Sequence, residues 1–144
     1  MKKAFFFLLA ILALHTVSAQ PTGIIQAAPA PNMVCQPIVF KYLGEFRMPN
    51  NQVEIRWQAY GQVKNNGNAT FHSTDAHLGL AVINTNNKVS EKVMSLEPGH
   101  VAQVELEVRY MKGQPKPVMS LTFVVDGTLE CNKTKEVPTW VVPN

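Results

Sequence analysis

Polar and apolar residues alternate most regularly between Val53 and Lys64. The apolar or small positions are Val53, Ile55, Trp57, Ala59, Gly61 and Val63, and polar side chains fill most of the positions between them. This period of two is typical of a β-strand with one buried face. The Asn65-Asn66-Gly67-Asn68 that follows contains residues that tolerate positive φ, so we expect the strand to end there in a turn.

The same kind of pattern continues along the chain without a helical period. Apolar side chains share one face in His100–Tyr110 and again in Met119–Val125, and Leu78–Ile83 is a continuous apolar run. Further strands are predicted over Gln36–Phe46, Val89–Met94, Thr128–Cys131 and Glu136–Val142. Turn signals separate them, including Thr85–Lys88, Pro98-Gly99 and Asp126-Gly127. Short strands with regular turns predict a single antiparallel β-sandwich of about seven to eight strands.

The first nineteen residues have the features of a secretory signal peptide. Lys2 and Lys3 form a basic start, Phe5–Leu14 is an apolar run, and Val17-Ser18-Ala19 is a small-residue cleavage site. The run is shorter than the ~20 apolar residues that cross a bilayer, and no later segment is long enough to replace it. We therefore predict cleavage after Ala19 and a periplasmic or secreted protein without stable membrane insertion.

Residues 20–34 are rich in Pro and Ala and precede the first strand signals. Pro21, Pro29 and Pro31 prevent a continuous helix, and few apolar side chains are available to pack. We interpret this segment as an extended leader, with a recognition motif as the alternative. The folded domain is then expected to span residues 35–144.

Charge argues against nucleic acid as a partner. The chain has 13 Lys and Arg against 10 Asp and Glu, so removal of Lys2 and Lys3 leaves 11 against 10, a formal charge of +1. The remaining basic residues are scattered over polar strand faces, whereas nucleic-acid-binding domains cluster theirs. The sequence contains no Lys/Arg-rich amphipathic helix of the kind that binds a membrane surface.

The two cysteines, Cys35 and Cys131, lie near opposite ends of the predicted mature chain. Export would place them where disulfides persist, and two cysteines allow one intramolecular pairing. Closing a loop of roughly 100 residues contributes about 4 to 5 kcal/mol in the chain-entropy model. Free thiols, a metal site or a redox pair are the alternatives, and no C-x-x-C motif favours redox chemistry.

Several turn motifs resemble the CARDB-like branch of immunoglobulin-like domains. In chain order they are Val63-Lys64-Asn65-Asn66-Gly67-Asn68-Ala69, an apolar strand, Ser95-Leu96-Glu97-Pro98-Gly99-His100 and Phe123-Val124-Val125-Asp126. The resemblance covers residues 53–135 and implies an immunoglobulin-like sandwich, in which Trp57 would match the core tryptophan. CARDB domains are linked with adhesion and binding in bacterial surface and exported proteins, so the resemblance also implies a binding role. They are usually modules of larger chains, whereas this domain is expected to stand alone with a disulfide.

The densest polar cluster, Phe71–His77, contains candidate metal ligands. His72, Asp75 and His77, together with His100, are residue types that bind Zn²⁺ or Cu²⁺. In an extended strand His72 and His77 would face opposite sides, so only a curled loop brings them together. A loop of hydrogen-bonding residues is the alternative explanation, and no other cofactor is predicted.

The same cluster holds the residue types of a hydrolase triad in Ser73, Asp75 and His77. A triad needs its base between nucleophile and orienting acid, held by rigid elements beside an oxyanion hole. No G-x-S-x-G motif occurs in the chain. We therefore predict a protein that is not an enzyme.

Binding of a protein or glycan partner is expected through loops or along an edge strand. The loops 65–77 and 112–117 are the candidates, because binding residues concentrate on loops held by a rigid scaffold. Tyr60, Tyr110 and Trp140 are candidate contact residues, although packing beside the disulfide is an alternative role for Trp140. The alternative functions are a small periplasmic metal-binding protein using the His-rich loop and an exported protease inhibitor.

Overall fold

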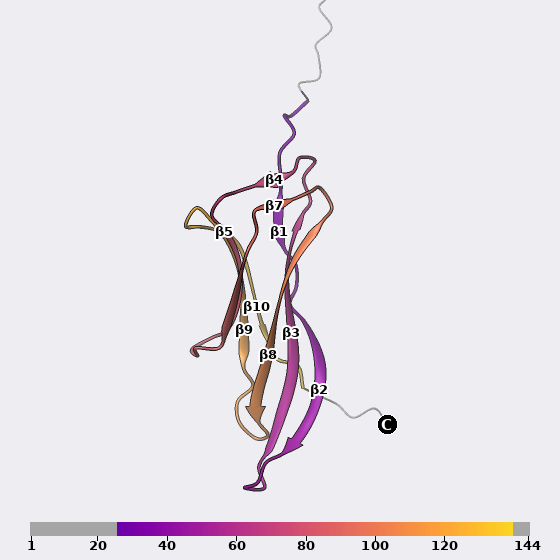
Figure 1. Cartoon of the computed structure of the whole chain (residues 1–144). Helices are drawn as coiled ribbons and strands as arrows, with labels where there is room; N and C mark the ends of the chain where they lie inside the picture. The colour runs from indigo at the N-terminus through magenta and orange to yellow at the C-terminus, as the bar shows by residue number, and fades with distance from the viewer. Residues whose placement is uncertain (1–25, 140–144) are drawn as a thin grey trace, which may run out of the picture.

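The computed structural model describes residues 26–139, so the predicted signal peptide and Trp140 lie outside the described residues. This part of the chain forms two antiparallel four-stranded sheets packed face to face, without a helix (Figure 1). The first sheet contains β1 (Met33–Cys35), β2 (Val39–Arg47), β3 (Val53–Asn65) and β8 (Val101–Met111). The second contains β5 (Ala76–Val82), β6 (Lys88–Lys92), β9 (Val118–Val125) and β10 (Thr128–Glu136). A short pair, β4 (Phe71–His72) and β7 (Ser95–Leu96), lies at one end.

Strand β3 is the centre of the first sheet and confirms the strand predicted from Val53 to Lys64. On one side β8 pairs with it from Glu54 to Lys64, and on the other side β2 and β1 pair with it one after the other. The alternation has the predicted effect, because Trp57, Ala59 and Val63 are all buried. Gly61 faces the second sheet, and a Cβ there would come within 2.5 Å of Leu121 Cδ1.

The second sheet has the order β10-β9-β5-β6. Its inner face carries Met119, Leu121 and Phe123 of β9 and Leu78 and Leu80 of β5, all fully buried. In the immunoglobulin strand order, β1 and β2 take the place of strand A, β3 that of strand B and β8 that of strand E. In the facing sheet, β10, β9, β5 and β6 take the places of strands G, F, C and C′. The predicted fold class, an immunoglobulin-like antiparallel sandwich, is therefore confirmed.

The disulfide between Cys35 and Cys131 is formed, as predicted, with a Cα–Cα distance of 5.7 Å. It joins β1 of the first sheet to β10 of the second, so it links the two layers near the start and the end of the domain. Disulfides of this kind persist outside the reducing cytosol. Within residues 26–139 there is also no helix long and apolar enough to span a membrane.

The end of the domain differs from the predicted strands. Thr128–Glu136 is one continuous strand with a bulge between Leu129 and Cys131, where two separate strands were predicted. The strand lies at an exposed sheet edge, so its side chains show little alternation of polar and apolar residues. At the other end, β1 begins at Met33, two residues before the predicted start of the domain.

Trp57 does not take the place expected from the immunoglobulin-like resemblance. The core tryptophan of antibody domains lies on strand C, whereas Trp57 lies on β3, in the place of strand B. Its ring packs edge-on against Phe40 and Tyr42 of the neighbouring β2, at centroid distances of 6.3 and 5.0 Å. The tryptophan is thus part of an aromatic cluster within the first sheet.

Candidate functional site

Four segments of the chain meet at the upper end of the molecule in Figure 1, where β4 and β7 are labelled. They are residues 66–75 between β3 and β5, residues 93–100 between β6 and β8, the Asp126-Gly127 turn between β9 and β10, and residues 30–32 of the leader. In immunoglobulin variable domains, the loops between strands B and C and between F and G form the antigen-binding surface. The corresponding connections here belong to this upper end.

Asn65, the last residue of β3, holds these segments together. Its side chain is fully buried. The Oδ1 atom accepts hydrogen bonds from the backbone N–H groups of Asn32 and Gly67 at 3.1 and 2.9 Å. The Nδ2 atom donates to the carbonyls of Ala69 and Leu96 at 2.8 and 2.9 Å. One amide therefore links the leader, the turn after β3 and β7.

The backbone of Asn65 joins a further turn to the same assembly. Its N–H donates to the carbonyl of His100 at 3.1 Å, and its carbonyl accepts from the N–H of Gly99 at 2.7 Å. Gly99 has a φ of 78°, as a type II turn with Pro98 at its second position requires at its third position. The end of β3 and the Pro98-Gly99 turn thus form one hydrogen-bonded unit.

The last residues of the predicted leader pack against this unit. The N–H groups of Asn66 and Asn68 donate to the carbonyls of Asn32 and Ala30 at 2.7 and 3.2 Å. A Cβ at Gly67 would come within 2.6 Å of the backbone nitrogen of Asn32, so only glycine permits this approach. The end of the leader therefore forms part of the surface at the upper end.

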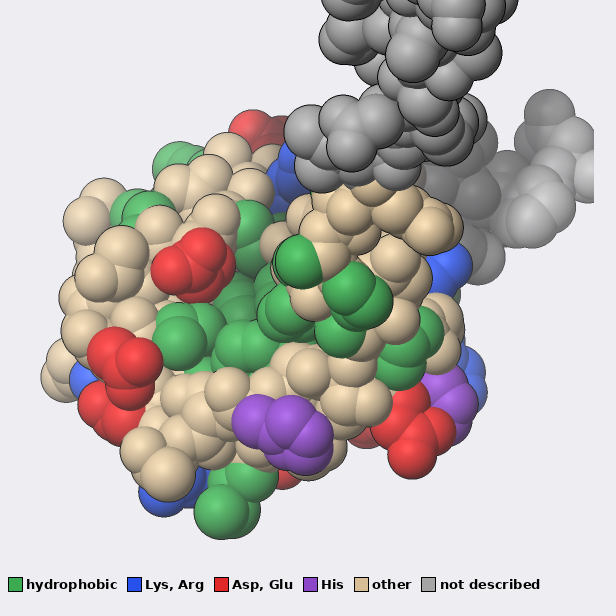
Figure 2. All heavy atoms as spheres, turned by 90° about the horizontal axis from the view of Figure 1, so that it is seen from above, with side chains coloured by type: hydrophobic (Ala, Val, Ile, Leu, Met, Phe, Trp, Pro, Cys, Tyr) green, Lys and Arg blue, Asp and Glu red, His purple; other side chains and the backbone are tan. Residues whose placement is uncertain are grey.

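A hollow of about 390 Å³, four of whose six lining residues are apolar, opens beside the leader. Its lining residues are Pro31, Asn32, Met33, Phe71, Val125 and Glu130. Phe71 lies at the base of the hollow. Its ring makes an edge-on contact with the core residue Phe123, with the ring centroids 5.6 Å apart. Figure 2 shows hydrophobic side chains in a band across this end, with acidic side chains and a histidine around them. We call this feature the apolar hollow.

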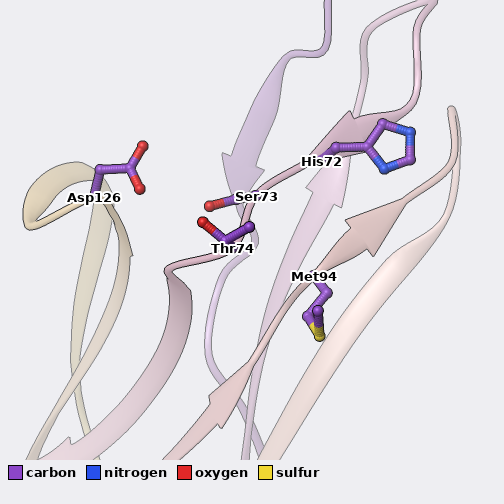
Figure 3. A pocket seen from close by; sticks show the side chains of 5 residues that line it. All are labelled: His72, Ser73, Thr74, Met94 and Asp126. Atoms are coloured by element: carbon purple, nitrogen blue, oxygen red, sulfur yellow. The ribbon is translucent and has the colours of Figure 1, made fainter.

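A second hollow of about 500 Å³, lined mainly by polar residues, lies next to it. It is lined by His72, Ser73, Thr74, Met94 and Asp126, and two of these follow Phe71 and Val125 of the apolar hollow directly in sequence. In Figure 3 the Asp126 carboxylate and the hydroxyls of Ser73 and Thr74 point toward one another, whereas His72 points away. Met94 is an apolar side chain left 59% exposed at this rim. We call this feature the polar hollow.

The four predicted metal ligands are not brought together as one set. His77 Nε2 lies 3.1 Å from Asp75 Oδ1, and His100 Nε2 lies 3.6 Å from Glu97 Oε2 in a separate exposed pair. His72 lines the polar hollow. Among residues 26–139 no group of three or more His, Cys, Asp or Glu side chains is arranged to hold a metal ion.

The Ser73, Asp75 and His77 set is arranged as a local turn. Ser73 Oγ accepts a hydrogen bond from the N–H of Asp75 at 3.0 Å, and Asp75 in turn contacts His77. The Asp75 carbonyl also accepts from the N–H of Asp126 at 2.8 Å, which ties this turn to the β9–β10 turn. These contacts place the polar loop against the neighbouring hairpin.

The predicted contact residues Tyr60 and Tyr110 line neither hollow, and Trp140 lies outside the described residues. Tyr60 is on the outer face of β3, opposite Glu105 of β8. Tyr110 lies near the opposite end of the sandwich, opposite Ile55 on the inner face. Trp140 follows the described residues. Of the two predicted loops, 65–77 belongs to the upper end and 112–117 to the opposite end.

Sequence reasoning missed the aromatic cluster at that opposite end. Burial raises the pKa of the Tyr42 phenol above its ordinary value, and the Glu45 carboxylate adds to the increase, while Lys112 opposes it. Lys112 Nζ is itself paired with Glu45 Oε1 at 3.0 Å. The alternation in Gln36–Phe46 placed Phe40 and Tyr42 on one face, but the pairing with Trp57 depends on strand register.

Comparisons with known proteins give structural likeness alone. No protein-family model and no curated protein matches the chain. Among solved structures, a structural genomics target called SoR45 is similar, with 11% identity and a TM-score of 0.46, over 78% of this chain and 92% of that one.

Two β-glucosidases also share partial likeness. One, from intestinal bacteria and involved in saponin metabolism, has 14% identity and a TM-score of 0.36 over 75% of this chain. The other is β-glucosidase 3B from Thermotoga neapolitana, with 12% identity and a TM-score of 0.34 over 76% of this chain. The match spans 16% of each of these enzymes.

Proposed function

We propose that this chain is an exported, non-catalytic binding module that holds an extended segment of a partner protein across the upper end of the sandwich. The observation that carries the proposal is the apolar hollow, where Met33, Phe71 and Val125 line an opening at the surface. Accessible apolar side chains with a polar rim are typical of protein-binding sites.

The frame around the hollow is suited to binding because it is preorganised. Asn65 fixes the leader and the loops by buried hydrogen bonds, and the disulfide joins the two sheets. A rigid site loses less conformational entropy when a partner binds. The loop flexibility that would otherwise oppose binding is therefore reduced.

The lining indicates the chemistry of the partner. An apolar side chain fits the floor formed by Met33 and Val125, while Asp126 and Glu130 present exposed carboxylates beside it. We infer a partner segment with an apolar residue followed by Lys or Arg. A glycan is less well matched, because sugars stack on exposed aromatic faces and Phe71 is 7% exposed.

Export and the CARDB-like motifs support the same role. Residues 1–19 have the features of a signal peptide, and the disulfide suits an oxidising compartment. The three motifs that resemble CARDB-like domains, which are linked with adhesion and binding, agree with such a role. The protease-inhibitor alternative rests on shape alone, and the metal-binding alternative lacks its ligand geometry among the described residues.

Site-specific photocrosslinking in the native host tests the proposal. A benzophenone amino acid at Thr74 should yield one discrete protein adduct, whereas the same group at Lys41, on the outer face of β2, should not. A peptide from the captured partner should then bind the purified chain, and Val125→Glu should abolish binding in a protein that remains folded by circular dichroism. Equal adducts at both positions, or peptide binding unaffected by Val125→Glu, would overturn the proposal.

A further inference from the structure

The edges of the two sheets are not equally protected against strand pairing. In the described part of the chain β2 carries a bulge between Tyr42 and Gly44, β10 carries one between Leu129 and Cys131, and β6 has five residues. Bulges and short edge strands are means by which proteins avoid edge-to-edge association. β8 has eleven residues, no register shift and pairs with β3 alone. Among the described residues, β8 is therefore the long edge strand without a bulge.

Alternate residues of β8 direct their backbone groups toward this open edge. The N–H of Lys112 donates to Val53 of β3, so the even-numbered residues face β3. The carbonyl of Glu107 accepts a hydrogen bond from Asn87 Nδ2 at 3.1 Å on the other side. Glu105, Glu107 and Arg109 thus offer backbone donors and acceptors at the edge, with their side chains on the outer face of the sheet.

We propose that β8 pairs antiparallel with β8 of a second copy of this chain, about a two-fold axis at Val108. In this register Glu107 of each copy lies opposite Arg109 of the other, and Glu105 lies opposite Met111. These are all edge-facing residues, as a hydrogen-bonded antiparallel pair requires. The two first sheets become one continuous sheet.

Charge selects this register over its neighbours. A shift that centres the axis on Glu107 or on Arg109 places that residue opposite its own copy, and like charges directly opposite destabilise a strand pair. Centring on Leu106 places Glu105 opposite Glu107. Only the axis at Val108 combines opposite charges at the centre with no like-charged pair.

The surroundings of Arg109 favour a second carboxylate. Arg109 lies opposite Arg56 in the pairing with β3, and both are on the outer face. Its Nε donates to Glu107 Oε1 of the same strand at 2.7 Å. A guanidinium carries five N–H donors, so it has capacity for a further carboxylate. Glu107 of a second copy supplies one.

Asn87 is a competitor for the same edge. Its side-chain bond to the Glu107 carbonyl occupies an acceptor that the second copy would use. Asn87→Ala removes this competition and should strengthen association. If Asn87 only stabilised the β5–β6 turn, its replacement would not raise the self-association constant.

A mixing experiment tests the register directly. Glu107→Arg and Arg109→Glu should each weaken self-association by about tenfold or more, because each creates facing like charges. An equimolar mixture of the two variants should form a mixed dimer of near wild-type affinity, because each Arg then faces a Glu of the other chain. Sedimentation velocity and native mass spectrometry measure this. A mixture that stays as weakly associated as its components would overturn the proposed register.

A backbone variant tests the edge itself. Glu105→Pro removes an edge-facing N–H but no bond to β3, so the chain should remain folded by circular dichroism and lose its dimer, while Glu105→Gln should keep it. Wild-type protein that sediments as a monomer at every concentration would overturn the proposal. Val125→Glu, which tests the upper-end site, should leave the dimer unchanged, so failure of one proposal is distinguishable from failure of the other.

Discussion

The side-chain amide of Asn65 donates a hydrogen bond to the backbone carbonyl of Leu96 at 2.9 Å, across 31 residues of sequence. Asn65 ends the central strand of the first sheet, and Leu96 belongs to the short pair that closes the upper end. The buried contact joins two turn motifs that lie far apart in the chain. The shape of the candidate binding surface therefore depends on one amide.

Substitution of Asn65 should destabilise the domain strongly. Asn65→Ala leaves partly buried donors and acceptors without partners and should lower the free energy of unfolding by about 2 to 4 kcal/mol. Asn65→Asp removes both Nδ2 bonds and adds a buried charge, so it should lower it at least as much. Urea unfolding measures the change. Asn66→Ala, on the exposed neighbour, is the control, and an equal effect there would contradict the role of Asn65.

Loss of the disulfide should reduce stability because the unfolded chain gains conformational entropy. Cys35 and Cys131 are separated by 96 residues in sequence, so their bond closes a long loop. Replacing both by Ala should lower the free energy of unfolding by about 2 to 5 kcal/mol. The difference in urea midpoint between wild type and the double variant measures it. Addition of reductant should shift the wild type alone, and a matching shift in the double variant would contradict this explanation.

Gly61 and Leu121 should show coupled effects on stability. A Cβ at Gly61 would overlap Leu121 Cδ1, so Gly61→Ala should destabilise by about 1 to 3 kcal/mol. In a Leu121→Ala background the space exists, and the same substitution should be neutral or favourable. A double-mutant cycle from urea unfolding gives the coupling. Additive effects would show that a side chain at position 61 does not contact the side chain at position 121.

Alkaline pH should destabilise the aromatic cluster through Tyr42. Its pKa is raised in the folded protein, first by burial and then by Glu45, so folding favours the protonated phenol. The resulting stability is fully present below the ordinary tyrosine pKa of about 10 and decreases as pH rises through the higher folded-state pKa. Tyr42→Phe should remove this component of the alkaline slope, measured by urea unfolding between pH 9 and pH 11. An unchanged slope would contradict it.

Zinc should not stabilise the domain. His72, His77 and His100 lie in separate contacts, and no described group of three ligands is arranged around a common point. A metal that binds only the folded state raises its melting temperature, so added Zn²⁺ should leave the melting temperature within error. A stoichiometric increase that is lost in His72→Ala or His77→Ala would show a site formed by rearrangement of the loop.

The sequence by itself determined the strands that have one buried face. In β3, β8 and β9 the side chains alternate between core and surface, so local pattern is enough to place them. The disulfide also followed from the sequence, because two cysteines allow one pairing and the predicted signal peptide would place them where disulfides persist. β10 was divided wrongly, since an exposed edge strand has little alternation to detect.

The tertiary structure alone decided what those strands bring together. The place of Trp57 beside Tyr42 depends on the register between β2 and β3, which alternation leaves undetermined. The separation of the histidines and the meeting of Phe71 with Val125 at the apolar hollow depend on how the loops pack. Burial pattern is a local property of a strand, whereas a binding surface is built from contacts between distant segments, and Asn65 with Leu96 is such a contact.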